Sequence, residues 1–98
     1  MKLKKSLGQN FLTDSFFLEK IIQSSQIQKF DDVIEIGPGD GALTELIIKN
    51  SKSLIAIEID QRFSKKLEKK YANADFKIHN TDFLKMNLSE IKLENKII

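Results

Sequence analysis

The stretch VIEIGPGDGALTELI, residues 33–47, changes its pattern abruptly in the middle. It begins with an apolar run that one acid, Glu35, interrupts, and three glycines and a proline follow within five positions. Beyond the glycines, apolar residues return at helical spacing, at Leu43, Leu46 and Ile47. This order predicts a short strand, a glycine-rich turn and a helix in direct succession.

Helices and strands alternate along the rest of the chain as well. Apolar residues recur at helical spacing or in short continuous runs, and turn-forming residues separate these segments. The predicted elements are helices over 13–25, over 42–49 and from Asp60 to Tyr71, and strands over 33–36, 54–60, 75–80 and 95–98. Crossovers of this length join parallel strands, so we expect an α/β fold with a mostly parallel, doubly wound sheet.

Ninety-eight residues suffice for one small domain. The last two residues, Ile97 and Ile98, fall where the core of such a fold is expected. We therefore expect the chain to be the N-terminal part of a larger protein, truncated near its fourth strand. We divide it into a basic arm over 1–12 and an incomplete Rossmann-like core over 13–98.

The composition argues against several classes of protein. The chain has no cysteine, which excludes disulfides and thiolate metal sites and suits a cytoplasmic protein. The single histidine, His79, has no second histidine or cysteine to join it, and we predict that it is neither a metal ligand nor catalytic.

No apolar segment approaches the ~20 residues of a membrane span, and the amino terminus lacks the apolar run of a signal peptide. We expect no metal and no membrane partner, and the sequence indicates no particular oligomeric state.

Positive charge is gathered in two clusters, although the net charge of the chain is only +2. A net charge this small does not by itself predict nucleic-acid binding. Taken alone, each cluster is typical of a solvated tail or a solvated helix face. The clusters are an amino-terminal arm with Lys2, Lys4 and Lys5, and a group on the third predicted helix with Lys65, Lys66, Lys69 and Lys70.

The glycine-rich turn lies at the carboxyl end of the first predicted strand, where parallel α/β sheets bind ligands. Gly37 and Gly39 let the backbone approach a ligand, and Gly41 allows close contact between strand and helix. The loop reads G-x-G-x-G, with Glu35 before it and Asp40 within it. Two acids disfavour a pyrophosphate and favour a ligand that carries an ammonium and a sulfonium. The pattern therefore favours S-adenosylmethionine over a nicotinamide dinucleotide.

Two further acids lie at or just beyond the ends of the next two predicted strands. Glu58 lies at the end of the second strand, where a carboxylate accepts hydrogen bonds from both hydroxyls of a ribose. Asp82 follows the third strand and is placed to accept from an adenine amino group, with Phe83 beside the ring. The alternatives are a helix-capping role for Glu58, for which Asp60 is better placed, and an ordinary turn for Asp82. Acids at three successive strand ends favour a nucleoside site.

Four segments of the chain match one family in their order and spacing. They are LGQNFL at 7–12, EIGPGDGALT at 35–44, IEID at 57–60 and NTDFL at 80–84. Together they resemble the rRNA adenine N6,N6-dimethyltransferases, most closely the bacterial small-subunit branch, with the erythromycin-resistance methylases as near relatives. The glycine motif is common to many methyltransferases, whereas GQNFL is much more restrictive.

The resemblance implies a cofactor, a substrate and a set of contacts. The cofactor would be S-adenosylmethionine, and the substrate an adenine of small-subunit (16S) rRNA in a 30S ribosomal precursor, dimethylated at N6. The basic arm would then contact rRNA, because phosphate neutralisation supplies much of such affinity. The implied cofactor contacts are Asn10 and Leu12 at the methionine end, Gly37 and Gly39 in the glycine loop, Glu58 at the ribose and Asp82 at the adenine.

The resemblance also has consequences for catalysis and stability. The catalytic Asn-Leu-Pro-aromatic tetrad of the family follows the fourth strand, beyond Ile98, so no residue of this chain is assigned as catalytic. In the family's sheet the first strand lies between the second and the fourth. We therefore expect the edge of residues 33–36 that should face the fourth strand to be largely unpaired, and the chain alone to be poorly stable and inactive.

Three alternatives remain open. An erythromycin-resistance methylase would act on 23S rRNA instead, and nothing in these residues decides firmly between the two substrates. A nicotinamide-dependent oxidoreductase fragment would bind NAD. A non-catalytic RNA-binding piece would bind rRNA without any cofactor.

Overall fold

The computed structural model describes residues 15–86 and 96–98 of the chain. The predicted basic arm, with Asn10 and Leu12, lies outside the described residues. So does the start of the first predicted helix, at residues 13 and 14. The positions predicted for these residues are therefore not tested by the structure.

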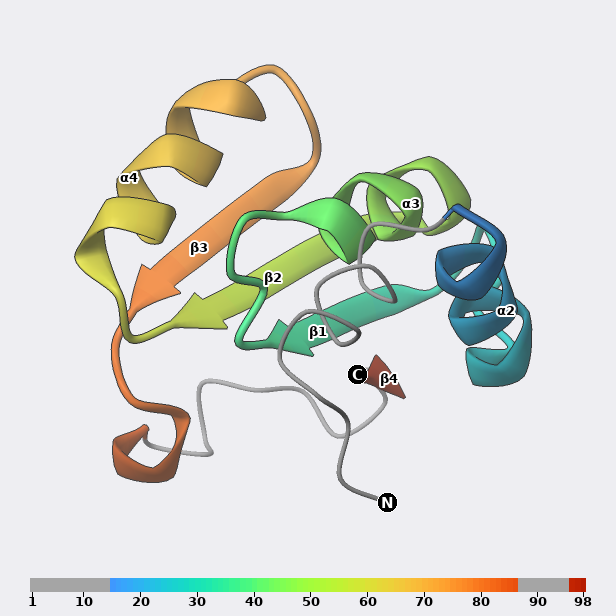
Figure 1. Ribbon diagram of the computed structural model, residues 1–98, viewed down its shortest axis with the longest axis horizontal. Coiled ribbons are helices and arrows are strands. Elements are labelled where there is room, and N and C mark those ends of the chain that lie inside the picture. The colour runs from blue at the N-terminus through green and yellow to red at the C-terminus, as the bar shows by residue number, and fades with distance from the viewer. Residues whose placement is uncertain (1–14, 87–95) are drawn as a thin grey trace.

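The described residues form a four-stranded parallel sheet with the strand order β3-β2-β1-β4 (Figure 1). The strands are β1 at Asp32–Ile36, β2 at Ser53–Glu58, β3 at Phe76–Asn80 and β4 at Lys96–Ile97. The predicted α/β class and the predicted place of the first strand, between the second and the fourth, are confirmed. Because all strands run parallel, their carboxyl ends lie at one edge of the sheet.

Within the described residues, three α-helices and one short 3₁₀ helix accompany the sheet. They are α2 at Ser15–Ser25, α3 at Ala42–Asn50, α4 at Gln61–Lys70 and η1 at Phe83–Lys85. Helix α4 packs on β3 and β2, α3 packs on β2, and α2 packs against α3. The predicted end of the second strand was two residues too late: β2 ends at Glu58, and the Asp60 side chain caps α4 by accepting a hydrogen bond from the Arg62 backbone N–H.

The main core lies between the first two strands and the neighbouring helices. Its buried members are Val33, Ile47, Leu54 and Ile27. Three of these come from the apolar runs that predicted strands and a helix, and their burial removes apolar surface from water. The core thereby holds β1 and α3 rigidly on either side of the glycine turn that joins them.

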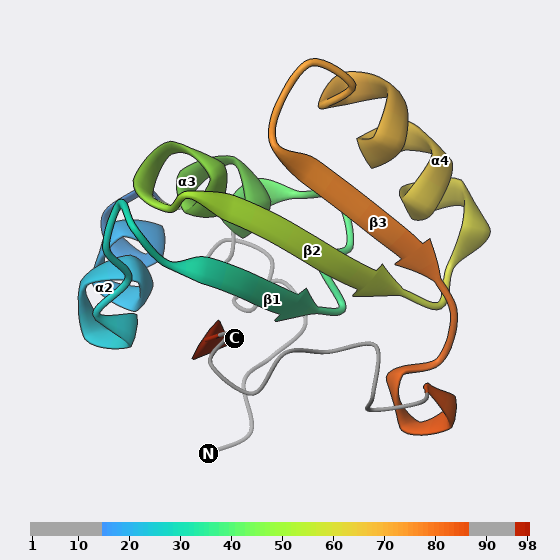
Figure 2. The same cartoon turned by 180° about the vertical axis from the view of Figure 1, so that it is seen from behind.

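The second edge of β1 is paired, so the prediction of a largely unpaired edge is wrong (Figure 2). Ile98 donates its backbone N–H to the Ile34 carbonyl at 2.8 Å and accepts from the Ile36 N–H at 2.9 Å. Lys96 anchors the start of β4 through an ion pair of 3.0 Å with Asp31. A ladder between parallel strands needs only a few residues in register, and the last residues of the chain supply them.

Candidate functional site

The glycine loop between β1 and α3 has backbone conformations that favour glycine. The φ angles of Gly37, Gly39 and Gly41 are 69°, 58° and 90°, all in the left-handed region. Among the described residues, a Cβ at Gly37 or Gly39 would meet no atom within 4 Å, whereas at Gly41 it would lie 2.5 Å from Leu67 Cδ2. The loop is therefore open along its first part and pressed against α4 at its end, as the sequence predicted for a close contact at Gly41.

Three hydrogen bonds hold this loop in place, two of them to residues of β2. The Gly37 N–H donates to the Ile57 carbonyl of β2 at 2.8 Å, and the Gly41 N–H donates to the Pro38 carbonyl at 3.0 Å. Between them, the Gly39 N–H donates to Glu58 Oε1 at 2.8 Å. A side chain at the end of β2 thus fixes the middle of the loop that follows β1.

Glu58 is buried, with 6% of its surface exposed, and both of its carboxylate oxygens accept backbone hydrogen bonds. Oε1 accepts from Gly39, and Oε2 accepts from the Asp60 N–H at 2.9 Å. The alternative role as a cap of α4 falls to Asp60, as predicted. Each carboxylate oxygen has a second lone pair, so Glu58 retains acceptor capacity for a hydroxyl group of a ligand.

Asp60 forms its own compact arrangement at the start of α4. Its Oδ1 accepts from the Arg62 backbone N–H at 2.8 Å, and its Oδ2 pairs with Arg62 Nη2 at 2.9 Å. These hydrogen bonds from Arg62 lower the pKa of Asp60 to about 2. Asp60 therefore stays ionised and is occupied in capping the helix.

Glu35 is a second buried carboxylate, at the end of β1. Its exposed fraction is 4%, and its Oε1 accepts a hydrogen bond of 2.6 Å from the hydroxyl of Thr44, which is fully buried. Burial raises the pKa of Glu35 to about 7; the Thr44 hydrogen bond opposes this shift and the charge of Glu58 adds to it. A cation beside Glu35 would favour its ionised form.

A cavity of about 360 Å³ opens beside the loop. It is lined by Glu35 and Asp40, by the backbone of Gly37 and Gly39, and by apolar side chains that include Phe63. Its volume falls within the range of small-molecule sites. The structure thus brings the two acids and the open glycines of the sequence prediction together around one cavity.

Glu58 and Asp82 do not line that cavity, although both lie at the same edge of the sheet. Asp82 caps η1, since its Oδ1 accepts from the Leu84 N–H at 3.0 Å. Asn80 joins the two strand ends, because its Nδ2 donates to the Glu58 carbonyl at 3.0 Å and to the Ile59 carbonyl at 3.2 Å. The turn role considered for Asp82 is therefore present, while its predicted adenine contact stays a prediction.

Three residues of this site were not singled out from the sequence. Thr44 gave no local signal, because its partner Glu35 lies nine residues away on another element. Phe63 belongs to the apolar pattern of its helix, and that pattern gives no signal that the side chain also lines the cavity. Asn80 was quoted within the NTDFL segment without a role, although an amide directly before two polar turn residues is a signal for a strand-end contact.

The structure also bears on metal binding, on the single histidine and on membrane-spanning helices. Within residues 15–86 and 96–98, no group of three or more His, Cys, Asp or Glu side chains could hold a metal ion. His79 is exposed on β3. In the same part of the chain, no helix has the length and apolar character needed to cross a membrane.

The parallel sheet, the strand order and the glycine loop define a Rossmann-like methyltransferase fold. The structure resembles that of the 23S rRNA methyltransferase ErmE, with 30% identity and a TM-score of 0.71 over 80% of this chain and 32% of the other. It also resembles a dimethyladenosine transferase from Plasmodium falciparum, with 31% identity and a TM-score of 0.69 over 76% of this chain and 28% of the other.

The sequence comparisons identify the family. The ribosomal RNA adenine dimethylase family matches residues 1–97, and the chain belongs to this family. A curated relative, ribosomal RNA small subunit methyltransferase A of Mycoplasma mobile, is 46% identical over 95 residues, which are 97% of this chain and 36% of the relative. The chain spans about a third of the length of the curated relatives that it matches.

Proposed function

We propose that this chain binds S-adenosylmethionine and forms the cofactor-binding part of an enzyme that dimethylates adenine N6 in small-subunit rRNA. The observation that carries the proposal is the cavity in which two acids, Glu35 and Asp40, flank the open backbone of Gly37 and Gly39. Membership of the ribosomal RNA adenine dimethylase family supports the substrate. The 30S precursor is the proposed partner, and the cytoplasm the proposed location.

The cavity fits a cationic ligand better than an anionic one. Glu35 is buried beside the loop, and a neighbouring ammonium would compensate the cost of burying its charge. A pyrophosphate in the same place would face both Glu35 and Asp40, and like charges in a partly buried site repel. The acids thus favour S-adenosylmethionine over NAD, the cofactor of the oxidoreductase alternative.

The chain's own residues would bind and orient the cofactor, which supplies the methyl group. Gly37 and Gly39 would allow the ligand to lie against the backbone, since at neither position would an added Cβ meet an atom of the described residues within 4 Å. Glu58 would accept from the ribose hydroxyls through its remaining lone pairs, and Asp82 would accept from the adenine amino group. Asn10 and Leu12 would contact the methionine end, as the family resemblance implies.

A ligand titration tests the cofactor. We expect the full-length protein that contains this chain to bind S-adenosylhomocysteine in a calorimeter and not to bind NAD. Binding of NAD alone would overturn the proposal in favour of an oxidoreductase. Binding of rRNA with no binding of either cofactor would instead support a non-catalytic RNA-binding role.

A second substrate is favoured by one specific observation, the similarity to the 23S rRNA methyltransferase ErmE. The same cofactor site would then serve an enzyme that acts on the large subunit. Incubation of the full-length protein with labelled S-adenosylmethionine and either 30S subunits or 23S rRNA separates the two. We expect label in the 30S subunits, and label in 23S rRNA alone would assign the second substrate.

A further inference from the structure

Helix α4 concentrates the positive charge of the chain. Its ten residues contain five cations and one acid, Glu68, so the helix has a net charge of +4, whereas the whole chain has only +2. The remaining 88 residues therefore have a net charge of −2. The cations are Arg62, Lys65, Lys66, Lys69 and Lys70.

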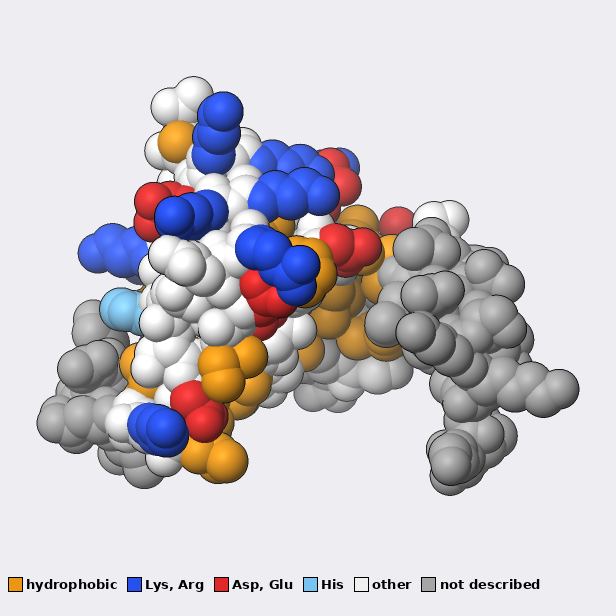
Figure 3. Space-filling model, turned by 60° about the vertical axis from the view of Figure 1, so that its left-hand side comes forward, with side chains coloured by type: hydrophobic (Ala, Val, Ile, Leu, Met, Phe, Trp, Pro, Cys, Tyr) orange, Lys and Arg blue, Asp and Glu red, His pale blue; other side chains and the backbone are white. Residues whose placement is uncertain are grey.

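The four lysines of α4 are exposed. Within residues 15–86 and 96–98, the ion pairs are those of Lys49 with Glu45, Arg62 with Asp60 and Lys96 with Asp31. The α4 lysines therefore form no ion pair there. Figure 3 shows lysine and arginine side chains gathered over α4.

The orientation of α4 follows from its buried side. Ser64 and Leu67 are buried, with exposed fractions of 6% and 0%, and the helix packs on β3 and β2. The lysines occupy the opposite side, toward solvent. Phe63, in the first turn, lines the proposed cofactor cavity, and a ten-residue helix is about 15 Å long. The lysines therefore lie no more than about 15 Å along the helix axis from a residue that lines the cavity.

We propose that Lys65, Lys66, Lys69 and Lys70 of α4 form a docking surface for RNA phosphates. The proposal rests on the proposed function and adds a contact surface that is separate from the cofactor cavity and from the amino-terminal arm. Lysines bind phosphates as mobile point charges and release condensed counterions, so this surface contributes affinity without reading the RNA sequence.

RNA fits this surface better than a membrane does. An interfacial helix binds a bilayer by inserting its apolar side, and the apolar side of α4 is already buried on the sheet. Phosphates of RNA need only the charged side. Anionic vesicles are therefore a useful comparison in the test.

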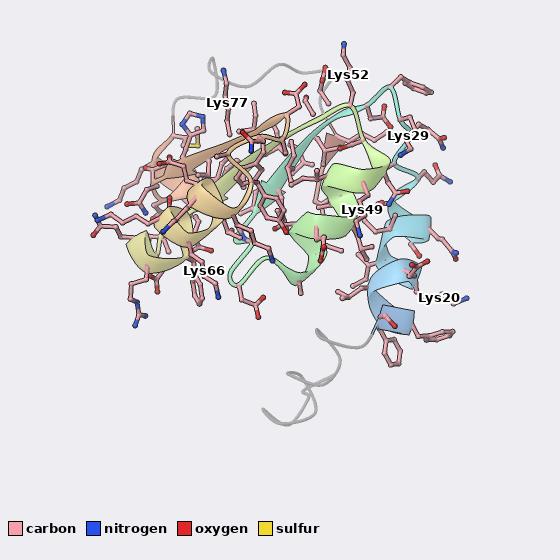
Figure 4. The ribbon with its side chains drawn as sticks, turned by 90° about the horizontal axis from the view of Figure 1, so that it is seen from above. Lys20, Lys29, Lys49, Lys52, Lys66 and Lys77 are labelled. Atoms are coloured by element: carbon pink, nitrogen blue, oxygen red, sulfur yellow. The ribbon has the colours of Figure 1, made fainter. Side chains whose placement is uncertain are left out.

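The test uses the full-length protein with all four α4 lysines changed to glutamine. Glutamine keeps the length and helix propensity of the side chain and removes its charge. The matched control changes four other exposed lysines to glutamine, so the net charge falls by the same amount. The control residues are Lys20, Lys29, Lys49 and Lys52. Figure 4 shows them around α2 and α3, at a distance from Lys66 on α4.

The readout is the salt dependence of binding to unmethylated 30S subunits. Four lost phosphate contacts should lower the slope of log Kd against log salt by about 3 and weaken binding at least roughly tenfold at physiological salt. The control variant should keep the slope of the parent within about 1. Both variants should bind S-adenosylhomocysteine as the parent does.

Several results would overturn the proposal. An unchanged slope in the α4 variant would remove this surface from the RNA contact while leaving the proposed function intact. An equal fall in both variants would assign the effect to net charge. Loss of binding to anionic phospholipid vesicles, with binding to 30S subunits unchanged, would assign the surface to a membrane. Failure of the parent to bind 30S subunits would refute both this proposal and the proposed substrate.

Discussion

Replacing Glu58 with alanine should affect both the stability of the protein and its affinity for the cofactor. In the structure, Glu58 accepts hydrogen bonds from two backbone N–H groups, those of Gly39 and Asp60. A hydrogen bond to a charged group contributes about 1.5–3 kcal/mol. Because the carboxylate is itself buried at a cost, we expect a net loss of about 2–4 kcal/mol in the free energy of unfolding.

The effect on affinity has a separate origin. Loss of the proposed ribose contact should weaken binding of S-adenosylmethionine by about 1.5–3 kcal/mol, roughly ten- to hundredfold. Urea unfolding of the full-length protein measures the first effect. Calorimetric titration at a temperature where the variant is folded measures the second.

Two variants sharpen this experiment. Glu58→Gln keeps the volume of the side chain and one acceptor, so it should lose less stability than Glu58→Ala. Glu68→Ala removes an exposed acid from α4 and should change the free energy of unfolding by no more than about 0.5 kcal/mol. Equal stability of Glu58→Ala and Glu68→Ala would refute the role of Glu58 in holding the glycine loop. Unchanged affinity would remove Glu58 from the cofactor site.

Gly41→Ala should destabilise the protein by about 1–3 kcal/mol, because the new Cβ would lie 2.5 Å from Leu67 Cδ2 in a left-handed backbone; a melting temperature equal to that of the parent would contradict this. The raised pKa of Glu35, about 7, means that the parent should lose up to about 3 kcal/mol of stability between pH 4.5 and 7 relative to Glu35→Gln. Parallel urea titrations at pH 4.5 and pH 8 measure this difference, and pH-independent stability differences would exclude it. Asn80→Asp keeps the size of the side chain but loses the N–H donors to the end of β2, so it should weaken S-adenosylhomocysteine binding about tenfold in calorimetry; full affinity would show that this link does not position the site.

The sequence by itself determined those features that depend on neighbouring residues. Apolar spacing located the strands and helices, and Asp60 was identified as a cap because a carboxylate directly before a helix accepts from its first free N–H groups. The three glycines were assigned to a tight turn, and all three have positive φ angles. These outcomes follow from steric contacts and hydrogen bonds between groups that are close together in the sequence.

Only the tertiary structure decided which distant groups meet. The bond from Gly39 to Glu58 spans 19 residues, and the one from Thr44 to Glu35 joins a helix to a strand. The extent of the pairing between β4 and β1 exceeded the expectation from the sequence, because Ile98 forms hydrogen bonds with two backbone groups of β1. Such contacts depend on the register of parallel strands and on how helices pack on them, and neither is encoded in the spacing of residues along the chain. The acids at the strand ends were visible in the sequence. Only the fold places Glu58 where it accepts a hydrogen bond from Gly39 of the glycine loop, and only the fold buries Glu35 so that its pKa is raised.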